Sequence, residues 1–229
     1  RDANSPDPAL PRAQITGVIL AGGAGQRLGG CDKGLHPLAG RPLIAHVRER
    51  LAPQVGTLLI CCNRHHDRYA QFGDRLISDS QPGHAGPLHG IAAALAVCTT
   101  PYLAIAPCDT PALPAHWVAR LGRQLLEHNA EVAVVHDGER LQSLCALWRV
   151  ELAGAVADHL AAGGSAPREF YRRCRSRWVD FSAEHAAFVN LNRAQEIAAY
   201  GDLIAQGHGI TACEQVMDEL GLVPLSQQL

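Results

Sequence analysis

Short runs of unbroken apolar residues alternate with helix-like segments along the first 138 positions of the chain. Apolar runs without polar alternation are typical of strands that are buried on both faces of a parallel sheet. We expect strands at residues 15–20, 57–62, 75–77, 102–106 and 132–136. Apolar residues at helical spacing predict helices at residues 42–51 and 117–127. A segment of small residues predicts a third helix at residues 90–97. The alternation predicts an α/β fold whose mostly parallel sheet lies between layers of helices.

Beyond Gly138 the pattern changes to shorter, mixed segments. We expect strands at residues 143–148, 178–181 and 187–192, and a helix near residues 150–160. This second part is α+β in character, and we expect it to close over the first.

The chain divides into three parts on this basis. Residues 15–200 form the main domain, with a first half at 15–138 and a second half at 139–200. Residues 1–14 are polar and rich in proline, so we expect them to be poorly ordered and to be no signal peptide. Residues 201–229 contain an amphipathic helix predicted at 212–220, to which we assign no role.

Polar residues recur where the predicted strands end. A glycine-rich loop follows the first strand, Asn63 the second, Asp79 the third and Asp109 the fourth. Open α/β sheets bind ligands beyond the carboxyl ends of their strands. The repeated placement of polar groups at these ends therefore predicts a binding cleft along one edge of the sheet.

The glycine-rich loop reads LAGGAGQRLGGCDKG, from Leu20 to Gly34. It lacks the third glycine of a dinucleotide fingerprint and the G-K-[ST] ending of a P-loop. Bare peptide amides can approach a nucleotide and form an anion-binding concavity, and Arg27 and Lys33 add positive charge. The loop composition fits a triphosphate cradle and, equally, a mobile turn with solvated charges.

Composition narrows the classes of function. The chain has 229 residues, of which 47% are hydrophobic, and a formal charge of −2, which argues against a general nucleic-acid binder. The apolar runs are shorter than the roughly 20 residues needed to cross a bilayer. The eight cysteines lack zinc spacing, so we interpret them as reduced thiols of a cytoplasmic protein, with Cys108 a packing residue and no nucleophile.

Several motifs occur in the order found in one enzyme family. They are LAGGAGQRLGGCDKG at the glycine loop, CNRH at 62–65, DS at 79–80, GPLHGI at 86–91, PCDTP at 107–111, HDGER at 136–140, and VDFS and FVNLN between 179 and 192. In these motifs the chain resembles the bacterial molybdenum cofactor guanylyltransferases, which join GMP to molybdopterin. The resemblance implies a Rossmann-like three-layer α/β/α sandwich of the nucleotide-diphospho-sugar transferase type.

The resemblance also implies site residues. It assigns catalytic roles to Arg27, Lys33 and Asp109, and Mg²⁺ binding to Asp109. It implies that GTP is bound by Leu20, Ala21, Gly22, Gly23, Lys33, Asn63, Asp79, Gly86 and Asp109. It implies acceptor binding by Gly30, Asn190 and Asn192. Guanine presents N–H donors, and the sequence leaves open whether Asp79, Asn63 or the backbone accepts them.

The resemblance implies GTP and molybdopterin as substrates, Mg²⁺ as cofactor, and molybdenum-insertion proteins and molybdoenzyme chaperones as further partners. It implies neither a nucleic-acid nor a membrane partner, and a monomer or weak oligomer. Two alternatives stay open: a nucleotidyltransferase with CTP or another phosphorylated acceptor, and a non-catalytic GTP-binding sensor or delivery protein. The arginines of residues 168–178 we interpret as a solvated helix face rather than a binding surface.

Overall fold

The computed structural model describes residues 10–22, 32–79 and 86–213. Within them, seven strands form the main sheet, and β2 (Pro37–Leu38) pairs with β3 (Arg41–Pro42) in a small hairpin. Across the main sheet the strands lie in the order β5 (Arg75–Ile77), β4 (Thr57–Cys61), β1 (Ile15–Leu20), β6 (Tyr102–Pro107), β8 (Leu141–Arg149), β7 (Val132–His136) and β9 (Ser176–Asp180). The α-helices are α1 (Leu43–Leu51), α2 (His66–Tyr69), α3 (Pro87–Val97), α4 (Trp117–Glu127), α5 (Ala153–Ala161), α6 (Pro167–Tyr171) and α7 (Ala194–Ala205).

The sheet is mostly parallel, as the sequence predicts. Strands β5, β4, β1 and β6 pair in parallel, and so do β7 and β9. Strand β8 is the exception, because it runs antiparallel to both β6 and β7. Both halves of the chain therefore contribute strands to one continuous sheet, rather than the second half closing over the first.

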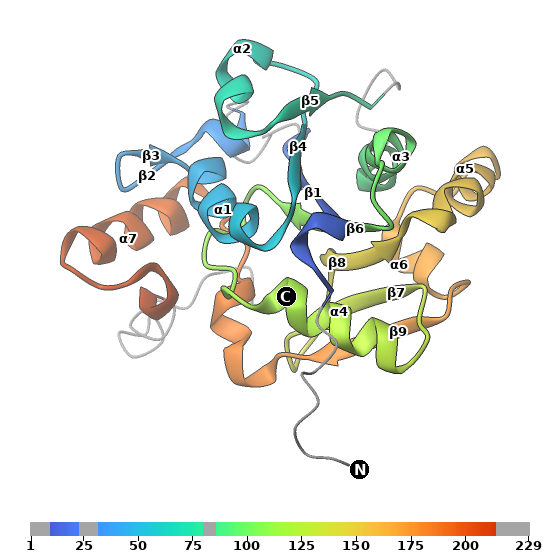
Figure 1. Ribbon diagram of the computed structural model, residues 1–229. Helices are drawn as coiled ribbons and strands as arrows, with labels where there is room; N and C mark the ends of the chain where they lie inside the picture. Colours follow the sequence, from blue (N-terminus) through green and yellow to red (C-terminus); the bar gives the residue numbers. More distant parts are fainter. Residues whose placement is uncertain (1–9, 23–31, 80–85, 214–229) are drawn as a thin grey trace.

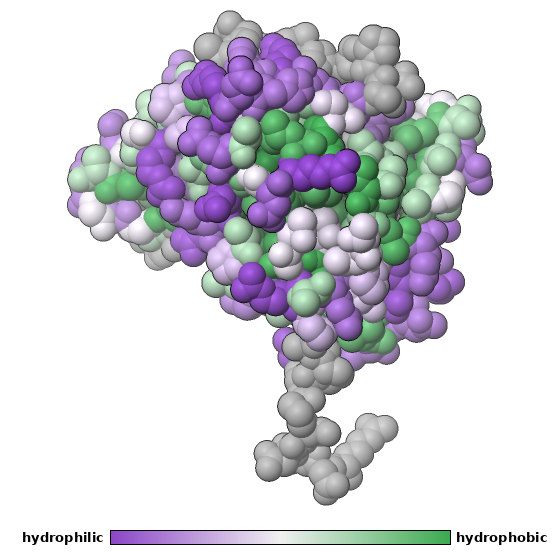
Figure 2. Space-filling view, turned by 45° about the horizontal axis from the view of Figure 1, so that its top comes forward, coloured by the Kyte–Doolittle hydropathy of each residue, from purple (hydrophilic) through white to green (hydrophobic). Residues whose placement is uncertain are grey.

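Helices cover both faces of this sheet (Figure 1). One face packs against α1 and α4 through residues such as Val47 and Leu121. The other packs against α3, α5 and α6, where Trp148 of β8 stacks on Phe170 with ring centroids 5.4 Å apart. Burial of these apolar side chains is the main stabilising term of such a sandwich. Hydrophilic residues surround a smaller central group of hydrophobic ones on the face in Figure 2.

The C-terminal segment packs against the side of this sandwich. Helix α7 and the 3₁₀ turn at Ile210–Ala212 bury apolar side chains against the β2–β3 hairpin and α1. Tyr200 and Cys213 lie in this third cluster. The part of the chain that the structure describes contains no helix long and apolar enough to span a membrane.

Three expectations need correction or lie outside the described residues. The strand expected at residues 187–192 does not form; a 3₁₀ segment, Ser182–Phe188, leads instead into an extended stretch outside the sheet. The expected charged helix face at 168–178 is divided among α6, a turn and β9, although its five arginines are exposed. The helix predicted at 212–220 lies almost entirely outside the described residues.

Candidate active site

A pocket of about 680 Å³ opens at the edge of the sheet where β1, β4 and β6 end. The last residues of these strands, Leu20, Cys61 and Pro107, line it, as does the beginning of β8. Because β8 is antiparallel, its first residues meet the carboxyl ends of its neighbours. The remaining lining residues are Gly22, Lys33, Asp79, Gly86, Pro87, Gly90, Cys108, Asp109, Arg140, Leu141, Gln142, Ser143, Leu144, Cys145, Asn190 and Asn192.

Lys33 is the cation at the centre of this pocket. Its ammonium group donates hydrogen bonds to Oδ2 of Asp109 and Oδ1 of Asn192. The side chains of Lys33 and Asp109 are 18% and 13% exposed, so the ion pair is mostly shielded from solvent. Lys33 is also the only lysine of the chain, because the other 19 basic residues are arginines. A compact ammonium fits between two oxygen atoms in a way that a planar guanidinium does not.

Asp109 is held at this edge by the backbone around it. The amide of Cys108 donates to the carbonyl of Leu20 at 3.2 Å, and the amide of Leu191 donates to the carbonyl of Asp109 at 2.9 Å. These bonds join the segment after β6 to the end of β1 and to the 189–192 stretch. The Asp109 carboxylate thereby stands between the two halves of the chain.

The oxygen donors around Asp109 fit a divalent cation. Oδ1 of Asp109 is buried and has no hydrogen-bond partner among the described residues, and the Asn192 amide oxygen accepts a hydrogen bond from the same Lys33 ammonium that bonds to Oδ2. No group of three or more His, Cys, Asp or Glu gathers in the described segments. Mg²⁺ binds through one or two carboxylates plus substrate phosphates and water, so this donor set suits a metal that arrives with a nucleotide.

A chain of side-chain hydrogen bonds lines the second half of the pocket. Thr110 donates to Oδ1 of Asn190 at 2.8 Å, and Asn190 donates to Gln142 at 3.4 Å. Gln142 in turn donates to Oδ2 of Asp137 at 2.6 Å. Satisfied buried networks of this kind fix side-chain positions. The loop after β6, the 189–192 stretch and the β7–β8 hairpin are therefore held in one arrangement.

Glu196 fixes Asn192 from the opposite side. Its Oε2 accepts hydrogen bonds from the amides of Asn192 at 2.8 Å and Arg193 at 3.1 Å, which caps the first turn of α7. An acid in a first helical turn also interacts favourably with the helix dipole. The helix thus positions an asparagine that contacts Lys33.

Asn63 and Asp79 form a second polar pair, at the ends of β4 and β5. Nδ2 of Asn63 donates to Oδ1 of Asp79 at 2.7 Å. This bond leaves the amide oxygen of Asn63 and Oδ2 of Asp79 as acceptors. A β-carbon at Gly22 would lie 3.6 Å from Nδ2 of Asn63, so the start of the glycine loop passes directly beside this pair.

Gly86 begins helix α3 at the rim of the pocket. Its φ of +96° belongs to a backbone region that L side chains rarely adopt. A β-carbon there would also lie 3.0 Å from the carbonyl oxygen of Ser165. Both observations require glycine at this position, which the sequence pattern singled out.

The thiols near the pocket are neutral packing groups. Burial raises the pKa of Cys61 to about 12 and that of Cys62 to about 11, and burial also raises the pKa of Cys108. A thiol with a raised pKa makes a poor nucleophile. All seven cysteines among the described residues are unpaired, which agrees with the expected reduced thiols.

The structure brings most of the predicted site residues together. Leu20, Gly22, Lys33, Asp79, Gly86, Asp109, Asn190 and Asn192 line one pocket. Ala21 is next to it through its amide, which donates to the carbonyl of Cys61 at 2.8 Å, and Asn63 is bonded to Asp79. Gly23, Arg27 and Gly30 lie outside the described residues.

Sequence reasoning missed several residues of the site. Gln142 and Glu196 were not assigned, yet each positions an asparagine of the pocket. Arg140 was noted only as part of a motif and lines the pocket. The available signal for Gln142 was a polar residue at the start of a largely apolar strand. No such signal was available for Glu196, because the N-cap of α7 is Arg193 and a capping box is recognised by Ser or Thr at that position.

Solved structures share this fold. The structure of molybdopterin-guanine dinucleotide biosynthesis protein A from Archaeoglobus fulgidus matches with a TM-score of 0.69 at 19% identity, over 84% of this chain and 100% of that one. A nucleotidyl transferase from Methanothermobacter matches with a TM-score of 0.66 at 18% identity, over 85% and 99% of the two chains. The chain therefore shares the fold of these two proteins.

Sequence relatives identify the family to which the chain belongs. A family model of the MobA-like NTP transferase domain matches residues 17–178. The molybdenum cofactor guanylyltransferase of Shewanella sediminis is 41% identical, over 84% of this chain and 98% of its own. That of Burkholderia cenocepacia is 44% identical, over 85% and 98%. The chain belongs to the family of molybdenum cofactor guanylyltransferases.

Proposed function

We propose that this protein transfers GMP from GTP to the terminal phosphate of molybdopterin and releases pyrophosphate. The observation that carries this proposal is the contact of Lys33 with Asp109 and Asn192 inside a pocket at the strand ends. This cluster offers an ammonium for phosphate charge and carboxylate and amide oxygens for a cation. The relatives at about 40% identity are named molybdenum cofactor guanylyltransferases, and this name supports GTP as the donor.

We assign the nucleotide to the half at residues 15–138. The glycine loop and Lys33 face the triphosphate, and Asn63 and Asp79 lie at the ends of the neighbouring strands. Guanine presents N1–H and N2–H₂ as donors. The free oxygens of the Asn63–Asp79 pair are acceptors of matching chemistry, so this pair selects guanine over adenine and cytosine.

We assign Mg²⁺ to Asp109. Nucleotidyltransferases generally use a divalent metal, and hard carboxylate and amide oxygens suit Mg²⁺. Oδ1 of Asp109 would be its ligand, and the Asn192 oxygen would be a second donor. When bound, the metal supplies charge neutralisation at the phosphates and fixes their orientation.

The chemistry needs alignment more than proton transfer. An oxygen of the acceptor phosphate forms a bond to the α-phosphorus of GTP, while the bond from that phosphorus to the bridging oxygen of pyrophosphate breaks. The nucleophile is already ionised, so no general base is required. Lys33 stabilises the negative charge that grows on the departing pyrophosphate, and Arg27 of the glycine loop adds to it.

We assign the acceptor to the half at residues 139–200. The start of β8, Arg140 and the asparagine pair Asn190 and Asn192 line this end of the pocket. The hydrogen-bond chain from Thr110 to Asp137 holds these groups in place before the acceptor arrives. Such preorganisation aligns the acceptor phosphate for in-line attack.

Beyond the substrates, we propose a cytoplasmic enzyme, because unpaired thiols persist in reducing compartments. Molybdenum-insertion proteins and molybdoenzyme chaperones are its further partners, because the product has to reach an apoenzyme. For the oligomeric state, we propose a monomer or a weak oligomer.

Pyrophosphate release with each of the four nucleoside triphosphates, with and without molybdopterin and Mg²⁺, tests the function. We expect release only with GTP, acceptor and metal together. Asp79→Asn lowers kcat/KM for GTP about tenfold or more, whereas Asp67→Asn, an exposed change on α2, leaves it unchanged. Faster release with CTP contradicts the proposal, and GTP binding without release identifies a sensor instead.

A further inference from the structure

A buried tyrosine lies directly beneath the segment that carries Lys33. Tyr69 is the last residue of α2, and its side chain is completely buried among core residues. Its hydroxyl donates a hydrogen bond to Oδ1 of Asp32, which is itself 8% exposed. A hydrogen bond to a carboxylate is roughly twice as strong as one between neutral groups. The bond therefore ties the residue before Lys33 to helix α2.

The same hydroxyl also contacts the residue after Lys33. A β-carbon at Gly34 would lie 2.6 Å from the oxygen of Tyr69, which is closer than real β-carbons come to other atoms. Gly34 is thus bare because the phenol occupies the space that a side chain would fill. Both neighbours of Lys33 are fixed by one oxygen atom, Asp32 by a hydrogen bond and Gly34 by close approach.

The backbone between these two anchors forms a short turn. Residues Lys33–Leu35 make a 3₁₀ turn in which the amide of Leu35 donates to the carbonyl of Asp32 and that of His36 to the carbonyl of Lys33, each at 3.1 Å. The Lys33 side chain leaves this turn toward Asp109 and Asn192. A turn clamped at both ends leaves the lysine few other directions.

Burial and, after it, the hydrogen bond to Asp32 raise the pKa of the Tyr69 phenol well above its ordinary value. The phenol is consequently protonated at neutral pH and available as a hydrogen-bond donor. Core filling alone would explain the ring of Tyr69 but not the placement of its hydroxyl between Asp32 and Gly34.

We propose that Tyr69 is a positioning residue for guanylyl transfer, acting through Asp32 and Gly34 to aim the Lys33 ammonium at the phosphates. The catalytic part of this inference rests on the proposed function. Tyr69 touches no substrate; it fixes the turn from which Lys33 reaches the pocket. Helix α2 begins three residues after Asn63, so the same short segment links the base-reading pair to the phosphate-binding lysine.

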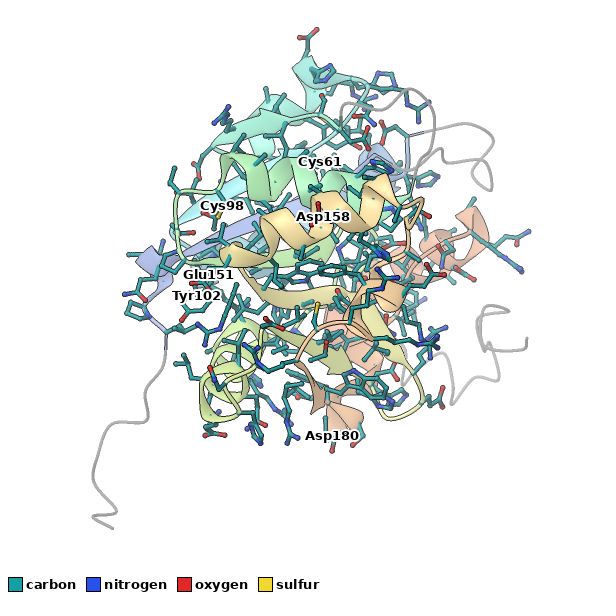
Figure 3. All side chains as sticks on the ribbon, turned by 90° about the vertical axis from the view of Figure 1, so that its right-hand side faces the viewer. Cys61, Cys98, Tyr102, Glu151, Asp158 and Asp180 are labelled. Atoms are coloured by element: carbon teal, nitrogen blue, oxygen red, sulfur yellow. The ribbon has the colours of Figure 1, made fainter. Side chains whose placement is uncertain are left out.

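The single lysine offers a direct readout of this role. Protein labelled with ¹³C,¹⁵N-lysine gives one lysine spin system, that of Lys33, whatever the activity of the sample. Tyr69→Phe removes only the hydroxyl. Tyr102→Phe makes the same change at the first residue of β6, at the opposite end of the sheet (Figure 3), and serves as the matched control.

We expect Tyr69→Phe to shift the Lys33 signals and to lower kcat about ten- to a hundredfold, while the KM for GTP stays within about twofold. Tyr102→Phe leaves both the signals and kcat unchanged. Asp32→Ala lowers kcat as well, and the double variant Tyr69→Phe/Asp32→Ala falls no further than Asp32→Ala alone, because the two residues act in series.

The inference is overturned if the Tyr69→Phe variant keeps the Lys33 signals and the kcat of the wild type. It is also overturned if the fold-losses in kcat of Tyr69→Phe and Asp32→Ala multiply in the double variant. If Asp32→Ala does not fold, the comparison of Tyr69→Phe with Tyr102→Phe decides alone. If the wild-type protein releases no pyrophosphate with GTP and molybdopterin, the proposed function fails, and the lysine signals still decide whether Tyr69 positions Lys33.

Discussion

At the residue scale, the proposed chemistry depends on the pair formed by Lys33 and Asp109. The Lys33 ammonium bonds to Oδ2 of Asp109 and to Asn192, while Oδ1 of Asp109 is buried without a partner in the described part of the chain. When a metal and a triphosphate bind, Lys33 has a competing set of anionic oxygens within its reach. We infer that it exchanges Oδ2 of Asp109 for the phosphates, whereas Oδ1 of Asp109 would hold the metal.

Lys33 substitutions test this role. Lys33→Ala is expected to lower kcat about 10²- to 10³-fold, in the range found when one preorganised group that stabilises transition-state charge is removed. Lys33→Arg keeps the charge but replaces a compact ammonium by a planar fork, so it recovers only part of the rate. Steady-state kinetics together with thermal melting separates a catalytic loss from unfolding. A Lys33→Ala enzyme with wild-type kcat rules the role out.

The sequence predicted single residues well where a strand end marked them. Asn63, Asp79 and Asp109 were found because each follows an apolar run, and the structure places them at one edge. Gln142, Glu196 and Tyr69 were not found, because their roles depend on partners that lie far away in the sequence. A tyrosine in a polar stretch gives no sign that its hydroxyl meets Asp32, 37 positions earlier.

At the element scale, the β7–β8 hairpin lines the side of the pocket that we propose for the acceptor. Its turn contains Gly138 at a φ of +101° and is closed by Asp137. Oδ1 of Asp137 accepts hydrogen bonds from the amides of Glu139 at 2.9 Å and Arg140 at 2.8 Å. Oδ2 accepts a hydrogen bond from the side chain of Gln142. One carboxylate therefore holds both the turn and the first polar residue of β8.

Asp137→Asn tests this hairpin through the pH dependence of stability. Burial by itself would raise the pKa of Asp137, but its hydrogen bonds outweigh this and hold the pKa below the ordinary value. Stability contributed by a lowered pKa is present above the unfolded pKa of about 4 and is lost as pH falls through the folded value. We expect Asn to cost about 1–3 kcal/mol of unfolding free energy at pH 7.

That cost shrinks as the pH falls below about 4, because the wild-type carboxylate then takes up a proton as well. Denaturant unfolding of both proteins from pH 7 down to pH 3 measures the difference. The same cost at every pH would show that the charge of Asp137 does not stabilise the hairpin. Asp158→Asn, on the outer helix α5 (Figure 3), is a suitable surface control.

Helices and strands could be predicted where the local pattern of apolar and polar residues determines them. They could not be predicted where pairing with distant strands determines them. The strands at 15–20 and 132–136 appear with the predicted bounds, because apolar runs bounded by polar residues leave little choice. The antiparallel insertion of β8 between β6 and β7 was not predictable, since no local pattern encodes strand order. The apolar run at 187–192 fills the core with Phe188 and Leu191 as irregular chain instead of a strand.

At the scale of the whole molecule, strand order joins the two halves into one site. Strand β8 leads away from the pocket edge while β1, β4 and β6 lead toward it. Residues from both halves of the chain therefore line one pocket at the edge of a single sheet. The helices on both faces bury this sheet and leave its carboxyl edge for ligands. The family resemblance predicted the fold class, and most of the site residues that it implied line the pocket. The structure adds the hydrogen-bond network that holds the pocket in shape.

A crystal structure with a non-hydrolysable GTP analogue and Mn²⁺ in place of Mg²⁺ tests the account most directly. We predict an anomalous peak within coordination distance of Oδ1 of Asp109, phosphates against the glycine loop, and Lys33 moved from Asp109 onto the β- and γ-phosphate oxygens. A nucleotide bound away from the edge where β1 and β6 end, or an ordered nucleotide with Asp109 free of metal and Lys33 still paired to it, would contradict the account.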